Sequence, residues 1–293
     1  MPIERIAILG TGLIGGSVGM ALCQSGFSGT IFGWDRDPSQ SAMALSRGAI
    51  HVVAEEPLTA ASGCDVVVLS GPVFSILEWL EQLAPILKPD QLVTDVGSVK
   101  SILCEHARGH YNRKDKPGFL PGHPMAGKEV SGVTNADSEL FRGAIWLFTE
   151  CVGSDSMSPA ARAKADEWRS WVQRFGTRTL ELEPARHDEL CAWVSHLPQF
   201  LSTALSALLE DKFPHDEELR AIGGRALREM TRLGASPYSM WRDIAHANSD
   251  AVAASLLALE QRLTHLREHL KTPELREEFD LANRFRPGTS QKP

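Results

Sequence analysis

The chain has 293 residues, of which 43% are hydrophobic and 23% charged, and its formal net charge is −7. A chain of this length forms one large domain or two, and the composition excludes disordered, collagen-like and small disulfide-stapled proteins. The acidic balance provides no overall field for a phosphate backbone, so nucleic acid is not an expected partner. All apolar runs fall short of the roughly 20 residues that span a bilayer, so no membrane partner is expected either.

The cysteines are odd in number and widely spaced, without a C-x-x-C pair, and no signal-like segment begins the sequence. These features favour a reducing, cytoplasmic setting. The cysteines are Cys23, Cys64, Cys104, Cys151 and Cys191.

An apolar run at residues 6–9 leads into a glycine-rich turn of the pattern G-x-G-x-x-G, which continues as an apolar, helix-like segment. In a strand–turn–helix unit the three glycines allow a tight turn, close approach of the backbone to a pyrophosphate, and close packing of helix on strand. The helix N-terminus then faces the phosphates. The pattern therefore predicts a dinucleotide site. The residues expected to bind the cofactor in this turn are Gly10, Gly12, Leu13, Ile14 and Gly15.

A second apolar stretch, residues 30–34, ends at Asp35, at the distance from the turn that a dinucleotide fold requires. Asp35 would accept hydrogen bonds from the ribose of NAD and repel the 2′-phosphate of NADP. The neighbouring Arg36 could instead pair with such a phosphate. Asp35 could also serve only as a helix N-cap, the role expected of Asp37. We favour NAD as the cofactor.

Further strand-like stretches alternate with helical patterns, which implies a parallel sheet. These stretches are residues 65–70, 92–95, 118–120, 145–149 and 177–182. After residue 184 only helical periods occur, at about residues 185–209, 216–232, 239–270 and 273–283. The sequence thus predicts an α/β Rossmann-type domain over residues 1–183 and an all-α domain over residues 184–293.

The predicted helices carry more apolar surface than about 110 residues would be expected to bury alone. We therefore expect a homodimer that covers this surface, the alternative being that the helices pack on the first domain. The residues concerned are Leu201, Leu205, Leu208, Leu209, Leu256, Leu257, Leu263, Leu266 and Leu270.

Two further stretches, TDVGSVK at residues 94–100 and GHPMAGKE at residues 122–129, each follow a predicted strand. Ligands of doubly wound sheets lie beyond the carboxyl ends of the strands, so both stretches should converge beside the nicotinamide.

These stretches, together with GTGLIGGS, FRGAIW, HDELCAWVSHLP and REMTRLGASPYSMWRDI, resemble the prephenate dehydrogenase family, which includes arogenate and cyclohexadienyl dehydrogenases. The resemblance runs from Ile6 to about Ile244. It implies oxidative decarboxylation of a cyclohexadienol with NAD, so that prephenate would give 4-hydroxyphenylpyruvate in tyrosine biosynthesis.

The resemblance also implies roles for single residues. His123 matches the family's acceptor for the substrate hydroxyl proton, a role that a neutral imidazole can fill at pH 7. Ser98 matches the serine that orients this histidine and contacts the nicotinamide or the hydroxyl. Taken alone, a histidine between glycine and proline is more often an ordinary loop residue.

Several matching positions are expected to bind substrate. Arg232 matches the family's arginine for a substrate carboxylate, which a guanidinium binds with two parallel hydrogen bonds, although it could instead form a domain-interface ion pair. His196 matches an active-site histidine and Trp241 a pocket residue. Glu129 matches an acid that gates or contacts the substrate.

One position departs from the family. Gln199 stands where members that use prephenate often have a second histidine, and an amide never carries a histidine's positive charge. Arogenate, which would give tyrosine directly, therefore stays open as the substrate.

Two other functions are considered. A 3-hydroxyacid or imine reductase would need a catalytic lysine or asparagine motif that we do not find, and a catalytically silent NAD-binding regulator is the alternative outside enzymes. His187 and Cys191 share a helix face, but two ligands are too few for a metal site, and no metal is expected.

Overall fold

The computed structural model describes residues 2–151 and 156–285. Its central feature is a parallel six-stranded sheet of order β3-β2-β1-β4-β5-β6, which confirms the predicted Rossmann-type fold. The strands are β1 (Arg5–Leu9), β2 (Thr30–Trp34), β3 (Val52–Val53), β4 (Val66–Leu69), β5 (Leu92–Asp95) and β6 (Gly118–Leu120). The short strand β3 is not apparent from the sequence because its two valines are both exposed.

Helices cover both faces of this sheet, so successive residues of β1 enter different cores. Ile6 and Ile8 pack in a cluster that includes Val18 of α1. Ala7 and Leu9 face a second cluster around α4 and α5. The helices of this part are α1 (Leu13–Gln24), α2 (Pro38–Ser46), α3 (Pro57–Ser62), α4 (Val73–Leu83), α5 (Ser101–Ala107) and α6 (Pro159–Arg174).

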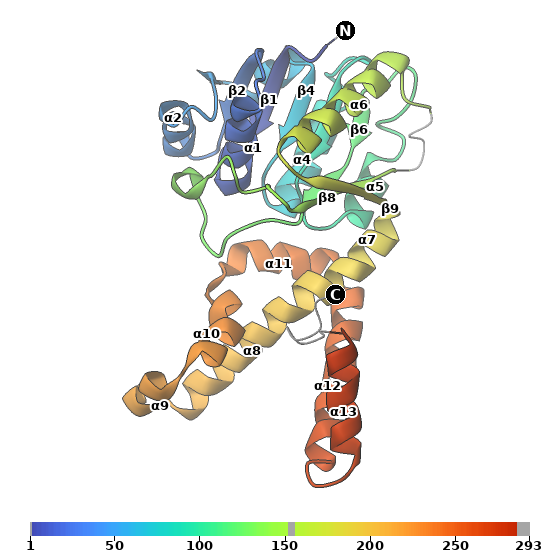
Figure 1. Cartoon of the computed structure of the whole chain (residues 1–293). Helices are drawn as coiled ribbons and strands as arrows, with labels where there is room; N and C mark the ends of the chain where they lie inside the picture. Colours follow the sequence, from blue (N-terminus) through green and yellow to red (C-terminus); the bar gives the residue numbers. More distant parts are fainter. Residues whose placement is uncertain (1, 152–155, 286–293) are drawn as a thin grey trace.

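Three further strands form a separate sheet beside the first (Figure 1). They are β7 (Gly122–Pro124), β8 (Ile145–Thr149) and β9 (Arg178–Leu182), with β7 antiparallel and β9 parallel to β8. The two predicted strands at 145–149 and 177–182 therefore exist but do not extend the parallel sheet. The reason is local: only Pro121 separates β6 from β7, and there the chain leaves the main sheet. An apolar strand pattern does not reveal which strand it pairs with.

Only helices follow β9 in the described chain. The three longest predicted helices are each interrupted: the first by a π-helical segment, the second at Gly223 and Gly224, and the third at Asn248. Glycine is among the least favourable residues in a helix interior, which accounts for the second break. The elements are α7 (Pro184–Cys191), the π segment η3 (Ala192–His196), α8 (Leu197–Lys212), α9 (Glu217–Ile222), α10 (Arg225–Thr231), the 3₁₀ turn η4 (Arg232–Ala235), α11 (Tyr238–Ala247), α12 (Ser249–Glu268) and α13 (Glu274–Phe285). The domain boundary at residue 183 stays a prediction.

The helical part contacts the first through α7 and α11, and two arms, α8–α10 and α12–α13, project away from it (Figure 1). Ile244 of α11 packs in the same core as Ile76 of α4. None of the leucines singled out above is buried in this chain; Leu208 is 62% exposed and Leu263 51%. The alternative that they pack on the first domain is therefore wrong. No helix of the described chain combines the length and apolar character that crossing a bilayer requires.

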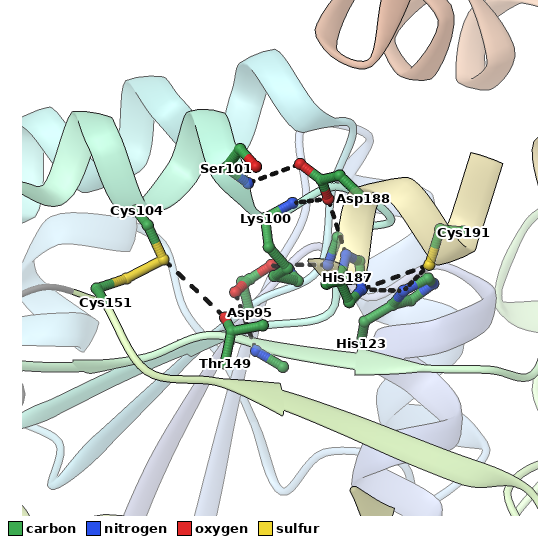
Figure 2. Close-up of polar contacts among 12 residues, drawn as sticks. Asp95, Lys100, Ser101, Cys104, His123, Thr149, Cys151, His187, Asp188 and Cys191 are labelled. Carbon is green, nitrogen blue, oxygen red and sulfur yellow. Dashed lines mark hydrogen bonds and ion pairs between the residues drawn. A yellow bond between two sulfur atoms is a disulfide. The ribbon is translucent and has the colours of Figure 1, made fainter. Parts of the chain in front are cut away.

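A disulfide joins Cys104 of α5 to Cys151, just beyond β8, with the two Cα atoms 5.1 Å apart (Figure 2). A reducing cytoplasm would not be expected to maintain such a bond. The pairing spans 47 residues, and it depends on how α5 and the second sheet meet, which cysteine spacing does not show. Among the described residues the free cysteines are Cys23, Cys64 and Cys191.

Candidate active site

The glycine turn between β1 and α1 has the geometry of a phosphate cradle. Gly10 has a φ of +101°, and a Cβ there would lie 2.0 Å from the carbonyl oxygen of Ser70. A Cβ on Gly15 would lie 1.9 Å from the carbonyl oxygen of Gly10. A Cβ on Gly12, in contrast, would meet no atom within 4 Å. The protein itself therefore needs glycine at the first and third positions, whereas the space beside the second is open to a ligand at the helix N-terminus.

Asp35 follows β2, and the turn holds its carboxylate in place. One carboxylate oxygen accepts a hydrogen bond of 2.7 Å from the backbone N–H of Thr11, and the other accepts one of 3.1 Å from that of Asp37. The first oxygen also accepts from the Thr11 hydroxyl at 3.5 Å, whereas the second keeps a lone pair for a ribose hydroxyl. Asp37, and not Asp35, caps helix α2, and Arg36 is exposed. The turn and this carboxylate together fit a dinucleotide with an unmodified ribose.

His123 lies in β7, opposite Leu147 of β8, and its ring contacts the start of the helical part (Figure 2). Its Nδ1 lies 2.9 Å from Nε2 of His187 in α7. The Nδ1 of His187 lies 2.8 Å from a carboxylate oxygen of Asp188. Two residues of the helical part therefore orient the histidine that the sequence singles out.

Asp188 is tied in turn to the first domain. Its two carboxylate oxygens accept hydrogen bonds of 2.7 and 2.8 Å from the backbone N–H groups of Lys100 and Ser101. The buried ammonium of Lys100 pairs with Asp95 at the end of β5, and Asp95 also accepts a hydrogen bond from the backbone N–H of Gly122, next to His123. These contacts link β5, β7, α5 and α7 in one polar network.

Burial largely decides the protonation states of this network. It lowers the pKa of His123 well below the usual value, and the neighbouring His187 and Lys100 lower it further. Burial also lowers the pKa of His187, although Asp188 opposes this. For Asp188, burial raises the pKa, but hydrogen bonds from His187, Ser101 and Lys100 outweigh that effect and the net shift is downward. At neutral pH both histidines are neutral and Asp188 is ionised.

These charge states determine the tautomers. A carboxylate only accepts hydrogen bonds, so His187 carries its proton on Nδ1 and its Nε2 is an acceptor. His123 must then donate through Nδ1, which leaves a lone pair on its Nε2. Such a histidine can take up a proton.

A third buried histidine, His196, lies at the end of the π segment. The amide of Asn248 donates to its Nδ1 at 3.3 Å, so its Nε2 carries the proton. Burial lowers its pKa to about 4. Its ring lies 5.9 Å from that of Trp241 in α11. Within the described residues, both the His196 Nε2 and the Trp241 Nε1 are buried without a hydrogen-bond partner. Buried donors normally have a partner, so these two are suited to bind a polar ligand.

Arg232 and Glu129, the two charged residues expected at the substrate, form an ion pair with each other across the two parts of the chain. The arginine side chain is 60% exposed and that of the glutamate 30%. The pair matches the domain-interface alternative considered for Arg232, in a position where an anionic ligand could exchange with Glu129. The roles of both residues toward substrate stay predictions.

The side chain of Gln199 is buried in α8 and holds the turn that carries Arg232. Its amide N–H groups donate to the carbonyl oxygen of Leu233 at 2.7 Å and to the hydroxyl of Thr203 at 3.2 Å. Its carbonyl oxygen accepts from the hydroxyl of Ser236 at 3.0 Å. Gln199 thus positions the arginine, and a direct contact with the substrate side chain stays a prediction.

Ser98 is partly buried in the loop between β5 and α5, and its role toward the nicotinamide also stays a prediction. Sequence reasoning missed four members of the network: Asp95, Lys100, His187 and Asp188. A signal was present, because all four lie in the stretches TDVGSVK and HDELCAWVSHLP. The spacing of residues within each stretch could not show that the two stretches meet.

Comparison with known proteins agrees with this geometry. Residues 18–159 match the family model described as prephenate dehydrogenase, nucleotide-binding domain, and residues 183–285 match that described as its dimerization domain. The prephenate dehydrogenases of Lactococcus lactis and Bacillus subtilis are each 29% identical to the chain, over 92% and 85% of its length. The chain spans 70% and 65% of the length of these two relatives.

Two solved structures are similar over nearly the whole chain. A prephenate dehydrogenase from Aquifex aeolicus, in complex with hydroxyphenyl propionate and NAD+, has 28% identity and a TM-score of 0.86, and the match covers 98% of both chains. An arogenate dehydrogenase from Synechocystis has 28% identity and a TM-score of 0.76, over 96% of this chain and 98% of that one. With both domain models matched in order over a Rossmann-type fold and its helical partner, the chain belongs to the prephenate dehydrogenase family.

Proposed function

We propose that the chain is an NAD-dependent dehydrogenase that oxidises and decarboxylates prephenate, giving 4-hydroxyphenylpyruvate, CO2 and NADH in tyrosine biosynthesis. The observation that carries this proposal is the chain of hydrogen bonds from Asp188 through His187 to His123, which leaves His123 with a free lone pair on Nε2. The family match and the cofactor bound by the Aquifex relative support it.

The residues that would hold NAD are those of the cradle. The open space beside Gly12 would take the pyrophosphate and Asp35 the ribose hydroxyls, with Leu13 and Ile14 opening helix α1 beside them. NAD, when bound, supplies the acceptor for the hydride that leaves the ring carbon bearing the hydroxyl. The exposed Arg36 does not replace Asp35 at the end of β2, so we infer a preference for NAD over NADP.

His123 acts as the base. The 4-hydroxyl proton of the substrate passes to His123 Nε2 while hydride leaves the same carbon, and the hydroxyl oxygen becomes a carbonyl. Loss of the ring carboxylate as CO2 then returns the electron pair to the ring, which becomes aromatic, and the resulting phenolate regains a proton. The ionised Asp188 behind His187 stabilises the imidazolium that forms at His123, as the carboxylate of a catalytic triad does.

Substrate carboxylates require fixed cations and donors. Arg232 binds one carboxylate in exchange for Glu129, since a guanidinium forms two parallel hydrogen bonds with a carboxylate. The unpartnered donors of His196 and Trp241 bind the remaining oxygens. Both side chains are neutral, so they provide direction rather than charge.

Arogenate is the second candidate, because a similar structure is an arogenate dehydrogenase and because Gln199 has no charge that would repel the ammonium group of arogenate. The family match argues for prephenate, with arogenate as a measurable second substrate. The direct test is NADH formation from prephenate and from arogenate, each with NAD and with NADP. Turnover with neither substrate would leave a silent nucleotide-binding protein, and turnover with arogenate alone would reverse the substrate preference.

We also infer that the protein is a homodimer. The second family model is a dimerization domain, and the helical arms expose leucines that a second copy would cover. A cytoplasmic location stays a prediction.

A further inference from the structure

Three buried side chains meet beside the catalytic histidine: His123 from β7 and His187 and Cys191 from α7. Figure 2 shows their ligand atoms converging on one point. The Cys191 sulfur lies 3.6 Å from the His187 Nε2 and 3.9 Å from the His123 Nδ1, and the two nitrogens are 2.9 Å apart. The sequence shows His187 and Cys191 on one helix face; the fold adds the third member.

These separations are close to those of a tetrahedral metal site. With Zn–N bonds of about 2.0–2.1 Å and a Zn–S bond of about 2.3 Å, tetrahedral angles place two nitrogens roughly 3.3 Å apart and nitrogen and sulfur roughly 3.6 Å apart. The two sulfur–nitrogen separations agree within a few tenths of an ångström. The two imidazole nitrogens, now 2.9 Å apart, would need to move apart by a few tenths of an ångström. Their mutual hydrogen bond would be replaced by two bonds to the metal.

The surroundings also suit a metal. Histidines that ligate zinc commonly donate their other ring N–H to a carboxylate, which fixes the ring and raises its basicity. His187 already does this with Asp188. One thiolate from Cys191 and the carboxylate of Asp188 would together balance a divalent charge, whereas the nearby Lys100 is neutralised by Asp95. Burial raises the pKa of Cys191 to about 12, so the thiol stays protonated until a metal displaces the proton.

We propose that His123, His187 and Cys191 form a site for a thiophilic divalent cation of tetrahedral preference, such as Zn²⁺, and that its occupation switches off the dehydrogenase. The tautomers explain why a bound metal would inhibit the dehydrogenase. A metal on Nδ1 of His123 moves the ring proton to Nε2, and His123 then has no lone pair to accept the substrate proton.

The inhibition rests on the proposed function, but the binding does not, so binding is measured without turnover. Metal-free protein is titrated with Co²⁺, whose bond to a thiolate gives an intense charge-transfer absorption in the near ultraviolet, and Zn²⁺ is then added to displace it. Cys191→Ser removes the soft ligand. Cys64→Ser is the matched control, because Cys64 is also a buried free cysteine and burial likewise raises its pKa to about 12. Cys23→Ser tests the other cysteine–histidine pair, in which Cys23 and His51 lie 3.7 Å apart.

We expect the cobalt–thiolate absorption in the wild type, Cys64→Ser and Cys23→Ser proteins, and its loss in Cys191→Ser. Removing a direct ligand should weaken Zn²⁺ binding by more than the roughly 10–100-fold typical of an outer-shell residue. Zn²⁺ should then inhibit NADH formation by the wild type and both controls, and Cys191→Ser should resist it.

Absence of the absorption in the wild type, or its persistence in Cys191→Ser, would overturn the site. Equal inhibition of Cys191→Ser and wild type by Zn²⁺ would overturn the switch. A wild type that binds Co²⁺ but forms no NADH in metal-free buffer would instead contradict the proposed function and leave the site intact.

Discussion

The proton positions around His123 depend on a single residue 65 positions away in the chain, Asp188, because its carboxylate can only accept from His187. When the oxygen of Asp188→Asn accepts from Ser101, its amide N–H takes the place of the Oδ1 that His187 and Lys100 share, and His187 meets a donor. His187 would then reverse its tautomer, His123 would accept at Nδ1, and the lone pair on His123 Nε2 would be replaced by a proton. We expect kcat to fall by roughly 10²–10⁴-fold, the usual range for a lost acid–base group, with little change in NADH affinity.

Asp188 also accepts hydrogen bonds from two backbone N–H groups, so the substitution could lower stability. The midpoint of thermal unfolding of Asp188→Asn is therefore measured together with its kinetics. The two N–H groups bind different carboxylate oxygens, so an asparagine that keeps the Ser101 hydrogen bond loses the one from Lys100, and the midpoint shows what that loss costs in stability. A fully active Asp188→Asn would show that the tautomer of His123 is set elsewhere.

The ion pair of Arg232 and Glu129 predicts opposite effects for its two members. Arg232→Gln should raise KM for substrate by about 10- to 150-fold, which corresponds to a charge-assisted hydrogen bond of roughly 1.5–3 kcal/mol. Glu129→Gln removes the competing carboxylate, so KM should stay the same or fall. Arg225→Gln is the matched control, because Arg225 also forms an exposed ion pair, with Glu229 of its own helix. Similar KM values for the wild type and Arg232→Gln would make this arginine a purely structural residue.

Some of these residues could be predicted from sequence and some could not. Asp35 follows an apolar strand at a fixed distance from the glycine turn, so local pattern suffices for it, whereas His123 is identified by the resemblance of its stretch to a known family. The partner of His123 is 64 residues away, and no periodicity in either segment shows that contact. Gln199 illustrates the opposite error: its position in a motif suggests substrate contact, whereas its amide groups are occupied by the turn that carries Arg232.

Among the structural elements, the glycine turn allows effects on cofactor binding to be distinguished from effects on folding stability. Gly12→Ala adds a methyl group to open space, so we expect a stability cost below about 1 kcal/mol for the change at a helix N-cap and a marked loss of NAD affinity. Gly15→Ala drives a methyl group into the backbone of Gly10 and should destabilise the whole domain. Thermal melting and NADH titration of both variants check this. Equal NAD affinity of Gly12→Ala and wild type would place the pyrophosphate elsewhere.

Most strands and helices follow from hydrophobic period and glycine position, because these reflect local backbone preference and burial. What sequence could not resolve depends on tertiary contacts. Whether residues 145–149 join the parallel sheet or the second one is decided by the turn at Pro121. The π segment at residues 192–196 is invisible in the apolar pattern of the long helix, yet it contains His196. Such segments often occur at functional sites.

For the whole molecule, the exposed leucines of the helical arms predict that two copies of the chain associate. A homodimer should have a mass in solution of about 64 kDa, twice the 32.1 kDa of one chain, because burial of apolar side chains between copies is favourable by about 25 cal/mol per Å². Leu263→Glu in α12 should shift the mass toward that of a single chain. Leu180→Glu in β9, where the leucine is similarly exposed, serves as the control. Light scattering that finds a wild-type monomer at micromolar concentration would contradict the dimer.

In the proposed reaction a neutral His123, held by His187 and Asp188, is the base of an NAD-dependent oxidation of prephenate. The pH dependence of NADH formation from prephenate tests it most directly, with His123→Asn as the reference. Only neutral His123 accepts a proton, and burial lowers its pKa well below the usual value. kcat/KM should therefore stay level as pH falls from neutrality and decline only well below about pH 6.5, while His123→Asn should be roughly 10²–10⁴-fold slower throughout. A decline centred at or above about pH 6.5, or a His123→Asn variant as fast as the wild type, would contradict the claim.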